Sequence, residues 1–341
     1  NNNNIIMSAI ALRSPYYRKD TAGTGANSAK LTLTIDGTLQ YTLVKQTTAG
    51  AIMLWEISEL CRDFLDLSYD GISSNETITI ISTLTSHAST NGTGTALTTD
   101  TDTDFGYDAY GTFMQGANPS ISPTGSIPTW LVSKDPNGTF NNTFYIYVPV
   151  GATGSVPYIT TTYAQGYSSY TANQTEISGT PAGTKMNIIR VDCTKFGDGH
   201  KVVFVNKYGA VQEFWFFLKV VNTINKKQEK YQRNTLRTTG SLAGTYSQAK
   251  HTRQDYNTIA NENITLSSGF YPEWCNQWFE ELLLSEQVWI HRIKESNVSQ
   301  EEVVPVNVTK NSMVKKTVLN NKLIEYTFDF AMSADYINNI R

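Results

Sequence analysis

Residues 201–218 read KVVFVNKYGAVQEFWFFL and consist of two apolar runs on either side of a short polar turn. Runs rich in Val and Phe that flank a Gly-containing turn predict a β-hairpin, and Gly209 can adopt the positive φ that such a turn needs. The second run loses its alternation after Glu213, since the five residues that follow are all apolar. We therefore expect this strand to be covered on both faces, by another sheet on one side and by a helix, domain or neighbouring subunit on the other.

The same loss of alternation makes this strand a candidate interface. Either Trp215 and Phe217, or Phe214 and Phe216, are expected to face something outside the sandwich formed by the first part of the chain. A basic stretch further along, NKKQEKYQRNTLR at 225–237, is the second candidate. The interface candidates are Phe214, Trp215, Phe216 and Phe217 on the strand, and Lys226, Lys227, Lys230 and Arg233 in the basic stretch.

The composition indicates a β-rich chain with many polar turns. The chain has 341 residues, which exceeds the usual size of a single core, so two domains are expected. Only 17% of the residues are charged and the net charge is −3, so nucleic-acid contact is possible but not expected. No apolar run is long enough to span a membrane. The opening NNNNIIMSAIAL lacks the basic region and long apolar core of a signal peptide.

The first expected domain, 1–222, reads as a β-sandwich-like unit with one helix. A hairpin is predicted around Asp36-Gly37, because the runs on either side of this turn alternate between apolar and polar residues. A helix is predicted at about 51–66 from apolar residues at helical spacing. Residues 86–126 are rich in Thr, Gly and Asp and are expected to form loops. Short strands predicted up to 192 suggest a sandwich or barrel-like domain.

The second expected domain, 223–341, is an α+β module that begins with the basic stretch 225–237, interpreted as a linker that docks on an acidic neighbour. Its helix follows Pro272, and its wide apolar face leaves Glu280 and Glu281 outside. Trp274 and Trp278 are expected to press on the module's own sheet, which would make the module autonomous. The predicted strands of that sheet are 288–293, 303–308, 314–319 and 323–332. The predicted fold class is thus mainly β with a few helices, in two β-sandwich-like domains that each pack a helix on a sheet.

No motif in the sequence names a reaction, so neither catalytic nor cofactor-binding residues are predicted. The three cysteines are far apart and lack metal-ligand spacing, so buried free thiols are the preferred interpretation. Asp100, Asp102 and Asp104 alternate like the start of a calcium loop, but Phe105 and Gly111 stand where an EF-hand needs Gly and Glu. A solvated turn is preferred there, and ion binding stays open.

Three segments resemble virion structural proteins of tailed phages, notably those of crAss-like phages and their relatives. These segments are LRSPYY, FVNKYGAVQEFWF and the run from SSGFYPEWCNQWFEELLLSEQVWI to the end of the chain. The resemblance implies a neck or tail component without an active site, such as a connector ring, tail hub or tube subunit. It also implies a homo-oligomeric ring, contacts with other neck and tail proteins, and a place in a virion assembled in the host cytoplasm.

One alternative comes from another functional class. The many Trp and Tyr residues would also serve a secreted or surface carbohydrate-binding or glycan-hydrolysing β protein. The carboxylate pair of a glycosidase follows no local spacing rule, so the sequence alone leaves this alternative open.

Overall fold

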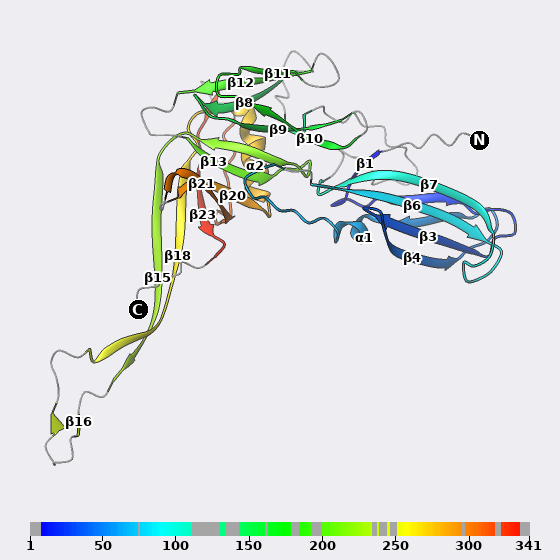
Figure 1. The fold of residues 1–341 in the computed structure, drawn as a ribbon, viewed down its shortest axis with the longest axis horizontal. Helices are drawn as coiled ribbons and strands as arrows, with labels where there is room; N and C mark the ends of the chain where they lie inside the picture. Colours follow the sequence, from blue (N-terminus) through cyan, green and yellow to red (C-terminus); the bar gives the residue numbers. More distant parts are fainter. Residues whose placement is uncertain are drawn as a thin grey trace.

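A computed structural model of the chain describes residues 8–73, 76–110, 130–133, 143–160, 163–178, 184–192, 199–233, 237–238, 244–245, 251–294, 297–317 and 322–334. The structure is mainly β and consists of several open sheets (Figure 1). Three sequence features lie wholly or partly outside the described residues: residues 318–321 of the predicted hairpin 314–319/323–332, Cys193, and residues 111–126 of the expected loop region. The strand predicted at 314–319 is wrong where it is described, because residues 314–317 form no strand and Leu323–Ile324 pairs with Tyr271–Pro272 instead.

A five-stranded sheet forms the N-terminal part of the molecule, in the spatial order β1-β7-β6-β3-β4. Its strands are β1 (Ser8–Ala11), β7 (Ala96–Tyr107), β6 (Thr77–His87), β3 (Ser28–Ile35) and β4 (Thr38–Gln46). The predicted hairpin is β3–β4, and both Asp36 and Gly37 have positive φ in its turn. A ribbon of β2 (Tyr17–Thr21) and β5 (Ile52–Glu56) shares the core of this sheet through Met53 and Trp55.

The helix expected at about 51–66 is mostly a strand. Residues 52–56 form β5, and only α1 (Ser58–Arg62) is helical. The apolar positions fit both structures locally, but pairing with β2 satisfies the backbone of β5 as a strand. The predicted apolar face survives in the short helix, where Ile57 and Cys61 are fully buried. Burial raises the pKa of the Cys61 thiol to about 12, as expected for a structural cysteine.

A seven-stranded sheet forms the central body, in the order β14-β13-β20-β21-β23-β18-β15. Its strands are β13 (His200–Val205), β14 (Val211–Phe216), β15 (Val220–Gln232), β18 (Arg253–Ser267), β20 (Val288–Lys294), β21 (Asn297–Val308) and β23 (Thr327–Met332). The predicted hairpin at 201–218 is confirmed as β13–β14, with Gly209 at φ 70°. Because β13 also pairs with β20, the sheet joins segments from both expected domains.

Four further sheets of the described structure are small. They are β11-β12-β8, from β8 (Thr143–Pro149), β11 (Glu176–Ser178) and β12 (Lys185–Val191); β9-β10, from β9 (Gly154–Ile159) and β10 (Gln165–Tyr170); β19-β22, from β19 (Tyr271–Pro272) and β22 (Leu323–Ile324); and β16-β17, from β16 (Arg237–Thr238) and β17 (Gly244–Thr245). On one face of β14, Tyr170 of β10 donates a hydrogen bond to Glu213. On the opposite face lies the helical segment η2 (Glu273–Cys275) and α2 (Asn276–Leu284).

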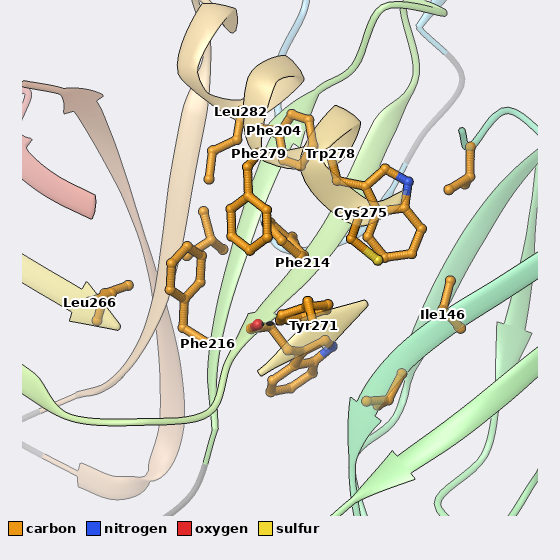
Figure 2. Close-up of a cluster of buried hydrophobic side chains, with 14 of the residues drawn as sticks. Ile146, Phe204, Phe214, Phe216, Leu266, Tyr271, Cys275, Trp278, Phe279 and Leu282 are labelled. Atoms are coloured by element: carbon orange, nitrogen blue, oxygen red, sulfur yellow. Dashed lines mark hydrogen bonds between the residues drawn. The ribbon is translucent and has the colours of Figure 1, made fainter. Parts of the chain in front are cut away.

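The core of the central body is an aromatic cluster between β14 and α2 (Figure 2). Phe214 lies with its ring centroid 4.8 Å from that of Phe279 and 5.9 Å from that of Trp278. Tyr271 packs 5.2 Å from Phe214, and its hydroxyl donates a 2.6 Å hydrogen bond to the carbonyl of Trp215. Offset and edge-to-face aromatic pairs of this kind add to the stabilisation from burial alone. The expectation that this strand is covered on both faces is therefore confirmed.

The C-terminal part is not a separate packing unit. Trp278 contacts Tyr147 of β8 and Phe214 of β14, and its indole N–H donates to the carbonyl of Ser133. The predicted helix face is otherwise confirmed, since Cys275, Phe279 and Leu282 are fully buried. The placement of Glu281 outside this face is wrong, because its side chain is 8% exposed and hydrogen-bonded to Ser133. The expected boundary at 222/223 thus runs through one sheet and one core.

Truncation of Trp278 tests this joint core. We expect Trp278→Ala to lower the free energy of unfolding by about 3–5 kcal/mol, because a buried indole leaves a cavity. Since the ring contacts both halves of the body, limited proteolysis of the variant should cut within 143–191 as readily as within 271–332. Trp274→Ala is the matched control with a smaller loss, because Trp274 is only half-buried. Digestion confined to the C-terminal part would contradict a shared core.

A second test concerns the contact between the N-terminal sheet and the body. A Cβ atom on Gly209 would lie 2.7 Å from the backbone nitrogen of Asp108, which directly follows β7. We expect Gly209→Ala to cost more than the roughly 1–2 kcal/mol of a left-handed non-glycine residue. Gly25→Ala is the control, since Gly25 has φ 81° but open space around it. Equal losses for the two variants in urea titrations would show that this contact is absent.

Candidate interaction surface

The most exposed part of the described chain is a long two-stranded arm, defined here by residues 220–233 and 251–267. In Figure 1 the arm leaves the central body on the side away from the N-terminal sheet. It is built from β15 and β18, which pair antiparallel over thirteen residues of β15, with one irregularity between Glu229 and Lys230. The strand β23 pairs with β18 only from Asn263 to Ser267, so beyond that point the arm is a free ribbon.

This arm is where the structure differs most from the sequence expectation. Residues 225–232, interpreted as part of a linker, lie in β15 at the edge of the seven-stranded sheet. The polar composition favours a linker on local grounds. Pairing with β18, between 21 and 36 residues later in the chain, satisfies the backbone instead.

The body end of the arm is anchored in the core, and the outer end is not. Ile264 and Leu266 of β18 are buried in the central body. Further out, Ile224 is 59% exposed and Tyr256 is 64% exposed. Two-stranded ribbons without a covering layer are only marginally stable in water, so an arm of this length is suited to being covered by a partner.

Cross-strand pairs provide the arm's own stabilisation. The ammonium of Lys226 lies 3.6 Å from the Asp255 carboxylate, a pair exposed enough to contribute little. Near the tip, the Tyr231 hydroxyl donates a 2.6 Å hydrogen bond to Gln254, and its ring packs 6.1 Å from that of Tyr256. These contacts fix the ribbon locally and leave most of its surface free.

The arm is also the basic part of an acidic chain. Residues 220–267 contain seven Lys and Arg but three Asp and Glu, whereas the whole chain has a net charge of −3. Of the interface candidates, Lys226, Lys227, Lys230 and Arg233 are all exposed here. Lysines along an exposed edge strand oppose uncontrolled strand pairing, and they also provide a surface for an acidic partner.

The aromatic interface candidates lie in the core of the central body and not on the exposed arm. Phe214, Trp215, Phe216 and Phe217 are each no more than 9% exposed, and they are covered within this chain. Phe216 packs against Phe328 and Phe330 of β23, which lie after residue 222. The lost alternation did signal a partner for this strand, but within the described structure the partner is the C-terminal half of the same chain.

The three aspartates of the calcium-like pattern lie on β7, where the sequence suggested a solvated turn. Arg18 of β2 takes the position that a cation would need, with guanidinium nitrogens 2.8 Å from Asp100 and 2.6 Å from Asp102. Asp104 is buried in the same row. Burial raises the pKa of Asp102, and the nearby Arg18 opposes that rise. Within the described part of the chain, no group of three His, Cys, Asp or Glu side chains is placed to hold a metal ion.

Searches of family models, curated proteins and solved structures find no match to this chain. Among the helices described, none is both long and apolar enough to cross a membrane.

Exposure of the arm can be measured in the isolated chain. Trypsin is expected to cleave first after Lys226, Lys227, Lys230 and Arg233, because a free ribbon opens at little cost. The amides of 224–232 should exchange hydrogen faster than those of β13, whose strand lies between two others. Preferential cleavage elsewhere, with the arm resistant in a monomer, would show that the ribbon is stable without a partner.

Proposed function

We propose that this chain is a structural subunit of a tailed-phage virion, in the neck or tail, and that it acts through protein–protein interfaces rather than by catalysis. It assembles with copies of itself, in a ring, and with neighbouring virion proteins. The observation that carries this proposal is the arm, because an exposed basic ribbon projecting from a packed body is a device for reaching a neighbouring subunit.

Two further observations support the proposal. The resemblance of three segments to virion structural proteins points to the same class, and the low content of charged residues suits a chain that buries surface against partners. The base of the arm is fixed to the central body, because Ile264 and Leu266 of β18 are buried in its main core. Rigid anchoring of a protruding element favours assembly over flexible tethering.

Removal of the arm tests self-assembly. Ile224 and Glu262 are directly opposite each other, so residues 225–261 can be replaced by an Asn-Gly turn without changing the strands below. We expect the shortened chain to keep the thermal midpoint of the body but to be monomeric in native mass spectrometry, whereas the full chain forms a defined oligomer. An oligomer of unchanged size and stability would contradict a role for the arm.

The carbohydrate-binding alternative has a separate readout. A virion subunit is expected to pass unretained through polysaccharide affinity columns and to be found in purified particles by mass spectrometry. Retention of the full chain on a polysaccharide, with elution by free glycan, would overturn the proposal in favour of the alternative.

A further inference from the structure

The N-terminal sheet ends on one side in β4, and the outer edge of this strand is free. Among the described strands, β4 pairs only with β3, and Figure 1 shows it along the margin of the sheet. The pairing with β3 is regular from Tyr41 to Gln46. Seven of the nine residues of β4 are exposed. A free edge presents backbone N–H and C=O groups at the spacing of another strand, so an extended segment fits it.

The other edge strands of the two large sheets are protected against such pairing, whereas β4 is not. β1 has only four residues, the Val211 amide of β14 donates to the Tyr167 hydroxyl, and β15 carries three lysines. The single charge of β4 is Lys45, whose ammonium lies 4.0 Å from the centre of the Trp55 ring and is thus turned back onto β5. An exposed edge without a guarding charge is a binding surface for a strand.

Carboxylates flank this edge. α1 and the residues that follow it pack on the core side of β4, where the Phe64 ring lies 5.9 Å from the ring of Tyr41. Glu59, Asp63 and Asp66 of this segment are exposed, and among the described residues none of their side chains has an ion-pair partner. Exposed carboxylates of this kind remain open to the cations of a partner.

The arm of a second copy matches both features. Among the described strands, the outer edge of β15 is unpaired, so it offers the backbone groups that the β4 edge needs. Lys226 and Lys227 point to opposite faces of β15, so either orientation of the arm turns a lysine towards the carboxylates beside β4. In Figure 1 the arm leaves the body on the side away from the N-terminal sheet, so it does not reach the β4 of its own chain.

The lysines of the arm also make this pairing selective. Two β15 edges side by side would bring the lysines of one copy close to those of the other, and like charges at opposite positions destabilise a strand pair. The middle of β4 is uncharged, so the arm meets no such repulsion there. Because the arm and β4 are different surfaces of identical copies, their contact builds a ring or a filament.

We propose that the arm of a second copy adds β15 to the free edge of β4 through backbone hydrogen bonds, and that its lysines pair with Glu59, Asp63 and Asp66. This inference rests on the proposed self-assembly and names the surface that the arm binds.

Charge placed on the β4 edge tests the strand contact. Thr42→Lys with Val44→Lys changes two exposed side chains, and should weaken self-association by about tenfold or more in sedimentation equilibrium, because the new charges repel the lysines of the arm. The thermal midpoint should not change. The control is Thr99→Lys with Thr101→Lys, which adds the same charge in the same two cross-strand rows, but on the interior strand β7. The control should associate like the parent chain.

An exchange of charges tests the ion pairs. Asp63→Lys with Asp66→Lys, and separately Lys226→Glu with Lys227→Glu, should each weaken association, because each pair of changes places like charges across the contact. A chain that carries all four changes should regain association, since the altered arm of one copy then meets the altered segment of the next. Glu176→Lys on β11 is the control and should leave association unchanged.

Hydrogen exchange separates strand pairing from ion pairing alone. In the assembled full chain, the amides of 41–45 that point away from β3 should exchange more slowly than in the same chain diluted to the monomer, because new backbone hydrogen bonds protect them. Equal exchange of these amides in the two states would overturn the addition of a strand.

The outcomes distinguish the two proposals. If the parent chain associates through its arm, but the variants in β4 and at Asp63 and Asp66 associate like the parent, the arm binds another surface. The inference is then overturned, and the proposed function stands. Loss of association in the β4 variant but not in the Lys226 and Lys227 variant would also overturn it, because β4 would then bind another segment. If the parent chain stays monomeric at every concentration that sedimentation can sample, self-assembly fails, and this contact fails with it.

Discussion

The structure depends on the position of β13 between β14 and β20. The pairing with β14 is local, within one hairpin, but the pairing with β20 crosses more than eighty residues of chain and joins the two halves into one sheet. The aromatic cluster of Phe214, Tyr271 and Phe279 then covers this junction. Burial of several large rings against a helix removes much apolar surface from water, and the edge-to-face contacts between the rings add to that stabilisation.

The arm follows from this central sheet. Because β18 pairs with β23 only near the body, the sheet holds the base of the arm and leaves its outer part uncovered. The short α2 buries Phe279 in the aromatic cluster and also brings Glu281 into contact with Ser133 and Lys207.

The aspartate pattern at 100–104 shows how folding pairs a row of like charges with a cation from another strand. The aspartates at 100, 102 and 104 share one face of a strand because side chains alternate, and Arg18 from a neighbouring ribbon neutralises part of that row. A carboxylate row with an internal guanidinium has less need of an external cation. The burial of Glu281 beside Ser133 and Lys207, in contrast, gives no signal in the sequence, because an acidic residue next to Glu280 suggests the polar side of the helix.

The sequence by itself determined the elements whose signals are local: the hairpins β3–β4 and β13–β14, the apolar face of α2, and the double coverage of the strand that contains Phe214. Turn residues and side-chain periodicity act over a few residues, so they can be read without the fold. Only the tertiary structure decided that 52–56 is a strand, that 225–232 belongs to an arm, and that Phe214 and Phe216 are covered by this same chain. These outcomes depend on strand pairing with β2 and β18 and on side-chain packing against α2 and β23, and no local pattern specifies which distant segment will supply these contacts.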